Sequence, residues 1–303
     1  PLNRQSVDKI METGIRSIDG FTTIGKGQRM GIFAGSGVGK SVLLSILAKQ
    51  SKADVNVIAL IGERGREVKE FIDKNLGEEG LKKSVIIVST SDQAPMLRLK
   101  AALTATAISE YFRDQGKDVM FMMDSLTRVA MAQREIGLAV GEPPTTKGYT
   151  PSVFSLLPKI IERAGNGTVG SITGLYTILI EGDDLDDPIG DTSRSLLDGH
   201  IVLSRKLASM GHYPPVDVLN SISRLANDII SDGHKDQKKK ILSLLSAYKE
   251  NEDLISVGAY EEGSNTLIDE AIKAKESISD FLIQDMNDST DFHYMQNEMN
   301  KLV

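Results

Sequence analysis

One glycine-rich segment constrains the fold of this chain more than any other feature. It runs from Gly31 to Ser41, with an apolar strand pattern before its glycines and a helical pattern after them. Glycines let a turn wrap around a phosphate chain with main-chain N–H groups pointing inward, and a helix N-terminus adds further donors. The order of strand, turn and helix predicts a phosphate-binding loop inside an α/β fold.

The residues of this loop predict a nucleotide with a magnesium ion. Lys40 can reach the β- and γ-phosphates, and the Ser41 hydroxyl can ligate Mg²⁺. The usual pattern has glycine where this chain has Ala34, which is a mild change provided that the residue keeps a negative φ. The alternative is a glycine-rich turn formed by chance. The predicted nucleotide-binding residues of the loop are Gly35, Ser36, Gly37, Val38, Gly39, Lys40, Ser41 and Val42.

Apolar runs alternate with helical patterns along most of the chain. Runs without strict alternation are typical of strands covered on both faces, as in a parallel sheet. We therefore expect an α/β fold with a mostly parallel, twisted, doubly wound sheet flanked by helices. The predicted strands are Met30–Phe33, Val55–Ile61, Val85–Val88, Val119–Met123, Ile172–Ile180 and Ile201–Leu203. The helices predicted after the first four strands are Val42–Lys49, Arg66–Asn75, Met96–Arg113 and Ser125–Ile136.

The second half of the chain changes in character. Glycine and proline in Gly137–Pro151 and Gly182–Thr192 predict long loops, which in compact domains are often functional. After about Asp236 strand patterns give way to helical ones. We expect a core domain over residues 1–235 and a small helical domain over residues 236–303. The helices predicted in the second domain are Lys238–Tyr248, Asn251–Val257, Thr266–Ile272 and Glu276–Gln284.

Composition excludes several classes of site and partner. The chain has no cysteine, so neither a disulfide nor a thiolate metal site can form. Its formal net charge of −7 argues against a nucleic-acid partner, and the one short basic cluster, Lys238–Lys240, is most simply a solvated face. Neither a signal pattern nor an apolar run of about 20 residues occurs. We expect a cytoplasmic protein with at most peripheral membrane contact.

Two acidic residues follow buried strands. Asp124 follows the fourth run directly, at the carboxyl end of a strand, where ligands of open α/β sheets bind. We predict that Asp124 is the partner of the magnesium ion. The alternative is that it caps the next helix. Glu63 follows the second run and is our candidate for the carboxylate that polarises an attacking water. The neighbouring Arg64 could stabilise phosphate charge. The alternative for Glu63 and Arg64 is a solvated ion-pair cluster on the first helical turn.

Two residues of a later segment could complete such a site. Tyr213 could present a ring on which an adenine stacks, and Arg224 could reach into the site of a neighbouring subunit. The alternatives are an ordinary core aromatic for Tyr213 and a surface ion pair for Arg224. Residue pattern alone favours these alternatives.

The motifs together resemble those of the type III export ATPases, relatives of the catalytic beta subunits of rotary ATP synthases. The loop Ala34–Leu44 resembles that of the flagellar branch. Alanine at position 34 is usual in the family, and the resemblance implies the family's RecA-like phosphate-loop core. The resemblance extends from Pro1 to about Phe281, and only the tail beyond Asp285 lacks a clear counterpart. The remaining matching stretches are Glu12–Asp19, Gly27–Arg29, Leu60–Val68, Asp124–Arg128, Gly141–Pro144, Gly148–Phe154, Glu181–Asp184, Asp198–Arg205 and Tyr213–Arg224.

The resemblance implies a role for each matching residue. Glu63 corresponds to the family's catalytic glutamate, Arg64 to an arginine near the γ-phosphate, and Asp124 to the acid that holds the magnesium water. Tyr213 corresponds to the adenine-stacking aromatic and Arg224 to an arginine finger supplied to the adjacent protomer. The resemblance places the rest of the adenine pocket near residues 281–286.

The resemblance also implies an assembly and a task. We expect a homohexameric ATPase that works with Mg²⁺ at the cytoplasmic face of an inner-membrane flagellar export apparatus, with export chaperones and substrates as partners. The family has an N-terminal β-barrel before the equivalent of Pro1, where a regulator binds, so we expect this chain to be a fragment without it. The alternatives are an injectisome ATPase, a Rho-like RNA translocase and an inactive ring subunit. Lys147 as the only basic residue in Gly137–Pro151 argues against the translocase.

Overall fold

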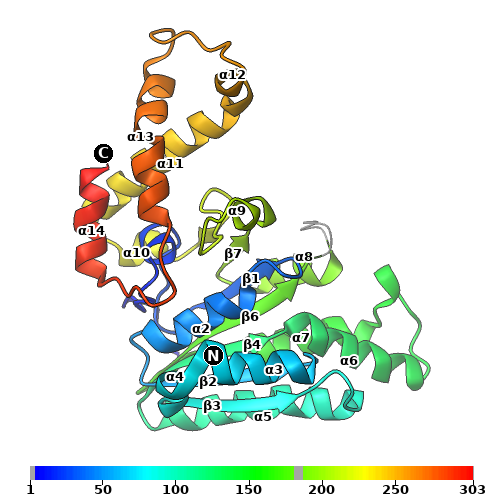
Figure 1. Ribbon diagram of the computed structural model, residues 1–303. Coiled ribbons are helices and arrows are strands. Elements are labelled where there is room, and N and C mark those ends of the chain that lie inside the picture. The colour runs from blue at the N-terminus through cyan, green and yellow to red at the C-terminus, as the bar shows by residue number, and fades with distance from the viewer. Residues whose placement is uncertain (1–3, 181–186, 303) are drawn as a thin grey trace.

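The computed structural model describes residues 4–180 and 187–302, and its centre is a twisted sheet with helices on both faces (Figure 1). In the described residues the sheet has eight strands, in the order β3-β2-β4-β6-β1-β7-β8, with β5 paired beside β6. The pairs from β3 to β7 are parallel, while β5 and β8 are short antiparallel additions. The strands are β1 Arg29–Ala34, β2 Val55–Ile61, β3 Ser84–Ser89, β4 Asp118–Asp124, β5 Gly165–Asn166, β6 Ser171–Leu179, β7 Gly199–Leu203 and β8 Ile222–Ser223. The predicted mostly parallel sheet is confirmed.

Helices connect these strands in the predicted alternation. The four predicted connections are α2 Lys40–Gln50, then α3 Gly65–Glu70 with a π-helical turn Phe71–Leu76 and α4 Gly77–Lys82, then α5 Pro95–Asp114, then α6 Leu126–Ala139. The other helices of the first 230 residues are α1 Arg16–Phe21, α7 Pro151–Ile161, α8 Pro188–Leu196, α9 Arg205–Ser209 and α10 Ala226–Ile229. A short 3-10 turn, Thr146–Gly148, interrupts the predicted loop between α6 and α7.

Each face of the sheet has its own apolar core. Along β1, Met30, Ile32 and Ala34 pack with α1, α2 and the C-terminal helices, while Phe33 packs with the helices of the opposite face. The opposite core contains residues of α5, α6, α7 and α8. Because both faces are covered, successive strand residues are mostly apolar, which is why the strands lack strict alternation.

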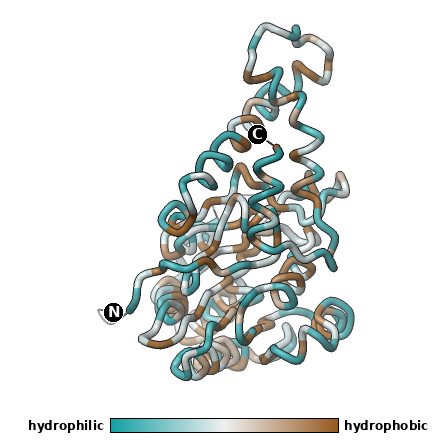
Figure 2. The backbone as a smooth tube through the Cα atoms, turned by 90° about the vertical axis from the view of Figure 1, so that its left-hand side faces the viewer, coloured by the Kyte–Doolittle hydropathy of each residue, from teal (hydrophilic) through white to brown (hydrophobic). Residues whose placement is uncertain are grey.

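The C-terminal helices project from the core as an elongated group (Figures 1 and 2). They are α11 Asp232–Glu250, α12 Glu252–Ser256, α13 Thr266–Leu282 and α14 Phe292–Lys301. Near its start, α11 is attached to the core through His234, whose buried Nε2 lies 2.8 Å from the main-chain oxygen of Gly20. The expected division between residues 235 and 236 stays a prediction. In the described part of the chain, no helix is both long and apolar enough to cross a bilayer.

Two predictions about helices were wrong. The segments Thr266–Ile272 and Glu276–Gln284 belong to one helix, α13, which ends at Leu282. It is continuous because the linking residues 273–275 are lysine and alanine, which favour helix. Helix α8 occupies part of the loop predicted at Gly182–Thr192. Of that loop, and of the matching stretch Glu181–Asp184, the residues 181–186 lie outside those described.

Candidate nucleotide site

The phosphate loop leaves β1 and enters α2 through two left-handed glycines. Gly37 has φ of 76° and Gly39 has φ of 92°, conformations that residues with a Cβ rarely adopt. Ala34 is the last residue of β1, and Lys147 is the only described non-glycine residue with a positive φ. The condition under which alanine is tolerated is therefore met. The loop brings the N-terminus of α2, with its free main-chain donors, to the carboxyl edge of the sheet.

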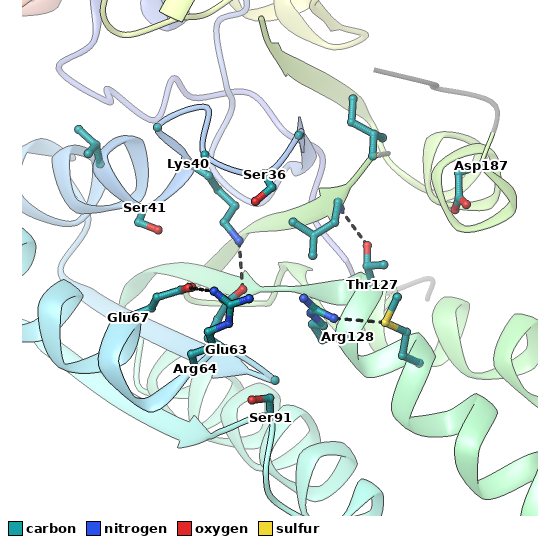
Figure 3. A pocket seen from close by; sticks show the side chains of 18 of the residues that line it. Ser36, Lys40, Ser41, Glu63, Arg64, Glu67, Ser91, Thr127, Arg128 and Asp187 are labelled. Atoms are coloured by element: carbon teal, nitrogen blue, oxygen red, sulfur yellow. Dashed lines mark hydrogen bonds and ion pairs between the residues drawn. The ribbon is translucent and has the colours of Figure 1, made fainter. Parts of the chain in front are cut away.

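Three charged side chains meet where β1, β2 and β4 end. Lys40 Nζ lies 2.5 Å from Asp124 Oδ1. It also lies 3.2 Å from Glu63 Oε1, toward which it points in Figure 3. Burial lowers the pKa of Lys40, but the two carboxylates outweigh this effect and raise it above its ordinary value. Burial raises the pKa of Asp124, and the nearby charge of Lys40 offsets only part of that rise. Residues far apart in sequence thus form one compact charged cluster.

Asp124 is held from the neighbouring strand, not by a helix cap. Thr177 of β6 donates its hydroxyl to Asp124 Oδ1 at 2.8 Å. The N-cap of α6 is Ser125, whose hydroxyl accepts the N–H of Arg128 at 3.2 Å. The capping alternative for Asp124 is therefore not observed. Asp124 is only 3% exposed, and its carboxylate belongs to the charged cluster instead.

A cavity of about 780 Å³ opens beside this cluster. The loop forms one wall, and residues after β2 and on α6 form the others (Figure 3). Its size matches the range of small-molecule and cofactor sites. Of the predicted nucleotide-binding residues of the loop, the cavity lining includes Gly35, Ser36, Gly37, Gly39, Lys40, Ser41 and Val42, while Val38 is buried beneath it.

Glu63 and Arg64 have different surroundings. The side chain of Glu63 is 15% exposed and faces Lys40, whereas that of Arg64 is 82% exposed and pairs with Glu67 at 3.3 Å. The alternative of a solvated ion pair thus describes Arg64 and Glu67, but it does not describe Glu63. Both Glu63 and Arg64 line the cavity.

The sequence did not single out Arg128, which faces the same cavity. Gly62 makes room for it: a Cβ at Gly62 would lie 2.8 Å from Arg128 Cβ. The Nε of Arg128 is buried and has no hydrogen-bond partner among the described residues. A signal was present in the spacing, because Arg128 lies one helical turn after Asp124 and so returns to the same strand edge. Other lining residues that the sequence did not single out are Ser91, Thr127, Met131, Arg134, Tyr149 and Asp187.

Tyr213 lies next to the phosphate loop. A Cβ at Gly39 would lie 3.5 Å from Tyr213 Cε1, and 42% of Tyr213 is exposed. It is therefore not an ordinary core aromatic. The segment expected to supply further adenine contacts is adjacent, because Gln284 donates its main-chain N–H to the Tyr213 oxygen at 2.8 Å. Phe281 is buried edge-on against Phe21, so its ring is not available to a base.

Arg224 lies away from the cavity of its own chain. It follows β8 at the far edge of the sheet, it is exposed, and its Nη2 donates to the main-chain oxygen of Arg194 at 3.1 Å. The structure does not bring Arg224 together with Lys40, Glu63 or Asp124. A role for Arg224 in a nucleotide site therefore requires a second protomer.

The oxygen donors beside the loop are suited to Mg²⁺. Among residues 4–180 and 187–302, no group of three or more His, Cys, Asp and Glu side chains could hold a metal by itself. Mg²⁺ bound with a nucleotide needs only one or two protein ligands, because phosphates and waters supply the rest. Ser41, Glu63 and Asp124 surround a small space of about 20 Å³, room for about one water-sized group.

A left-handed glycine loop between a strand and a helix, with a lysine facing an acid at the end of a neighbouring strand, defines a nucleotide-binding protein of the phosphate-loop class. Within that class, the sequence pattern of the ATP synthase alpha/beta family, nucleotide-binding domain, matches residues 14–223. The chain belongs to this family. The pattern of the T3SS EscN ATPase C-terminal domain matches residues 230–301.

Individual relatives agree with this assignment. The chain is 61% identical over 284 residues to the flagellum-specific ATP synthase of Bacillus subtilis, covering 94% of this chain and 65% of that relative. The chain thus spans about two thirds of the length of that curated relative. The resemblance to the flagellar members of the family is confirmed.

Solved structures extend the similarity to the whole chain. An ATPase described as prototypical of the type III secretion system of pathogenic bacteria is 49% identical with a TM-score of 0.94, covering 100% of this chain and 87% of that one. The assembled ATPase EscN of enteropathogenic E. coli, solved with its central stalk EscO, is 48% identical with a TM-score of 0.94, covering 100% and 73%. The expectation that the tail beyond Asp285 lacks a counterpart was wrong, since the C-terminal family pattern extends to residue 301.

Proposed function

We propose that this chain is the catalytic part of an ATPase that drives or gates protein export through a flagellar type III secretion apparatus. The contact of Lys40 with both Glu63 and Asp124 at the edge of a nucleotide-sized cavity carries the proposal. It joins a phosphate-binding cation to the two carboxylates that hydrolysis requires. The family assignment and the similarity to flagellum-specific relatives support it.

Binding begins at the phosphate loop. Main-chain N–H groups of Gly35–Ser41 and the N-terminus of α2 hold the phosphate chain, and Val42 lines the cavity beside them. Lys40 provides the positive charge for the β- and γ-phosphates. Tyr213, half exposed beside Gly39, supplies the surface on which the adenine stacks.

Hydrolysis is the task of Glu63. Its carboxylate lies at the cavity wall within reach of Lys40, where it can accept a hydrogen bond from a water and hold that water against the γ-phosphate. Arg64, on the same wall, supplies positive charge near the transferred phosphoryl group. Arg128 packs against Gly62 and lines the same cavity, and its guanidinium adds a second such charge.

Mg²⁺ bound with the nucleotide would supply positive charge between the β- and γ-phosphates. Ser41 is the residue that would hold it directly, and Asp124 would hold one of its waters. The hydroxyl of Thr177 fixes the Asp124 carboxylate for this purpose. The donors are all oxygens, as Mg²⁺ prefers.

Arg224 completes the site of an adjacent protomer in a homohexameric ring. It is exposed next to the edge strand β8 and near the amino ends of the parallel strands, away from the loop at their carboxyl ends, and a second copy can present its own cavity there. EscN, a similar structure, is described as assembled and as bound to a central stalk. We propose a stalk of that kind as a partner here, along with export chaperones, their substrates and a regulator bound to an N-terminal region.

We place this activity in the cytoplasm, at the inner face of the membrane that holds the export apparatus. The flagellar assignment is preferred over an injectisome because identity is 61% to the flagellum-specific relative and 49% to the secretion-system ATPase. Motility and secretion assays on a strain that lacks the gene separate the two. The flagellar role predicts that motility is lost and that secretion of virulence effectors is unchanged.

The test of the mechanism is Glu63→Gln. This change keeps the size of the side chain and removes the carboxylate, so we expect Mg–ATP affinity within about threefold of wild type and turnover lowered at least about 100-fold. Binding is measured with a fluorescent ATP analogue and turnover by phosphate release. Turnover equal to that of the wild type would contradict the assignment of Glu63.

Two controls accompany it. Glu67→Gln changes a carboxylate on the same cavity wall that pairs with the exposed Arg64, so we expect nearly wild-type turnover. Lys40→Ala removes the phosphate-binding cation, so both binding and turnover are expected to fall.

A further inference from the structure

Gln284 is a buried amide at the junction of three parts of the chain. It lies two positions after the last residue of α13, Leu282, and is only 5% exposed. Its main-chain N–H donates to the oxygen of Tyr213 at 2.8 Å. Its side chain reaches the opposite way, to the segment that begins α1. A single residue thus joins the C-terminal helices, the start of the core and the loop that carries Tyr213.

The side chain of Gln284 uses both ends of its amide. Oε1 accepts the N–H of Arg16 at 2.9 Å, while Nε2 donates to the oxygen of Gly14 at 2.7 Å and to that of Asp288 at 2.6 Å. This pattern fixes the orientation of the amide. If its oxygen and nitrogen were exchanged, the NH₂ group would face the N–H of Arg16 and the oxygen would face two carbonyl oxygens. Buried polar contacts that are fully satisfied hold a single conformation.

Tyr213 in turn lies against the phosphate loop. Its ring edge is at contact distance from the position that a Cβ of Gly39 would occupy, and Pro215 lies beside it. The ring itself is half exposed, and its main-chain oxygen is bound by Gln284. The position of the ring over the loop therefore depends on where residue 284 is held.

Resting on the ATPase function proposed above, we propose that Gln284 is a positioning residue that holds Tyr213 beside the phosphate loop for binding of the nucleotide base. It touches neither the phosphates nor the cluster of Lys40, Glu63 and Asp124. Replacing its side chain weakens binding of the base and leaves the chemical step unchanged.

The first experiment uses Gln284→Met, which keeps the length of the side chain and removes all four of its hydrogen bonds, including a long one of 3.4 Å from Nε2 to the Thr290 hydroxyl. We expect the KM for Mg–ATP to rise about tenfold and kcat to stay within about twofold, because only binding of the base is affected. Inhibition by magnesium tripolyphosphate, which has no base, is expected to keep its wild-type constant. A merely structural role would lower kcat through loss of folded protein and leave KM unchanged, and that result would overturn the proposal.

A double-mutant cycle tests whether Gln284 acts through the ring. In a Tyr213→Ala background, Gln284→Met is expected to have no further effect on KM for Mg–ATP, since the ring it positions is gone. Additive effects of the two changes would overturn the proposal. Gln50→Ala is the matched control, because it removes weaker, exposed contacts to the oxygens of Met286 and Asp288.

A second pair of variants avoids any change at position 284. Arg16 is the first residue of α1, where proline is tolerated, and Ile15 before it has an extended conformation that proline permits. Arg16→Pro removes the N–H that Oε1 of Gln284 accepts, whereas Arg16→Ala keeps it. We expect a higher KM for Mg–ATP in the proline variant than in the alanine variant, with equal kcat. Equal KM values would overturn the proposal.

The same measurements separate this proposal from the function on which it rests. Wild-type protein that binds neither ATP nor tripolyphosphate would overturn both. Wild-type protein that hydrolyses ATP, together with folded Gln284 and Arg16 variants of unchanged KM, would overturn only the role of Gln284.

Discussion

At the scale of single residues, Gly62 decides how closely Arg128 and Glu63 can approach the same cavity. It has φ of 73°, and a Cβ there would lie 2.8 Å from one Arg128 carbon and 3.0 Å from the next. Side chains are disfavoured at such a φ, and these contacts are shorter than packed carbons allow. The site therefore requires glycine at position 62, because a side chain there would collide with Arg128.

Gly62→Ala is expected to displace Arg128 or Glu63 and to lower turnover at least about tenfold, while the fold is retained. Phosphate release measures turnover, and circular dichroism verifies the fold. The control is Gly65→Ala, because Gly65 begins α3 and a Cβ there meets nothing within 4 Å. Equal turnover of the two variants would contradict the expectation.

Sequence reasoning located residues whose role depends on local order. Lys40 and Ser41 follow from the glycine pattern, and Glu63 and Asp124 follow from their places after buried strands. Thr177 could not be found in this way, because its contact with Asp124 depends on the register between β4 and β6. Register is a property of strand pairing that one sequence does not contain.

At the scale of elements, His234 joins α11 to α1. Its ring is buried, its Nε2 lies 2.8 Å from the Gly20 oxygen, and its Nδ1 has no partner among the described residues. Burial lowers the pKa of His234, and the positive charge of Lys238 lowers it further. The contact with the Gly20 oxygen raises the pKa, but by less than burial lowers it. The ring of Phe292 from α14 covers another side. The folded state therefore favours the neutral ring.

The sign of the resulting pH dependence follows directly. With the folded pKa below the ordinary 6.5, stability is fully present above about pH 6.5 and is lost as pH falls through the folded value. We expect the free energy of unfolding to fall between pH 7.5 and 5.5 more steeply in the wild type than in His234→Gln, by at most about 1.4 kcal/mol per pH unit. Urea titrations at each pH measure it. Parallel curves for the two proteins would contradict the expectation.

The sequence predicted a buried strand correctly but missed the start of one helix. The strand predicted at Val55–Ile61 has those bounds in the structure, because both faces are buried and its apolar run is continuous. Helix α8 was predicted as loop because Pro188 was taken as a breaker. It is instead the first helical residue after the N-cap Asp187, which accepts the N–H of Ile189. Proline and an acid before a helix are starting signals as often as they are loop signals.

At the scale of the whole molecule, the proposed site is divided between copies of the chain. Lys40 and Glu63 lie at the carboxyl ends of the parallel strands, whereas Arg224 lies near their amino ends, where its N–H donates to the oxygen of Asp198 just before β7. Glu63→Gln and Arg224→Ala should each be inactive alone. Mixed at high concentration, they are expected to regain activity in about a quarter of sites, where an intact Glu63 meets an intact Arg224 from the other variant. Phosphate release against mixing ratio measures it.

The control mixture combines Glu63→Gln with Lys40→Ala. Both changes damage the same side of the site, so no pairing of protomers restores it and no activity should return. Recovery in this control, or none in the first mixture, would contradict a shared site.

The overall architecture was predictable because alternating strands and helices permit few arrangements of a parallel sheet. The placement of the C-terminal helices was not, since the contact of His234 with Gly20 and that of Gln284 with Gly14 join residues more than 200 positions apart. Such contacts leave no periodic trace in the sequence. They are nevertheless what connects the helical group to the nucleotide site.

Arg224 lies near the amino ends of the parallel strands, while the phosphate loop lies at their carboxyl ends, and this separation limits how protomers can assemble. Two different surfaces must meet, so contacts between protomers would run head to tail, and a two-fold dimer could not form them symmetrically. An open row of protomers then always contains one incomplete site at its end, however long it grows. Only closure into a ring removes that end, so the last protomer to join would complete two sites at once.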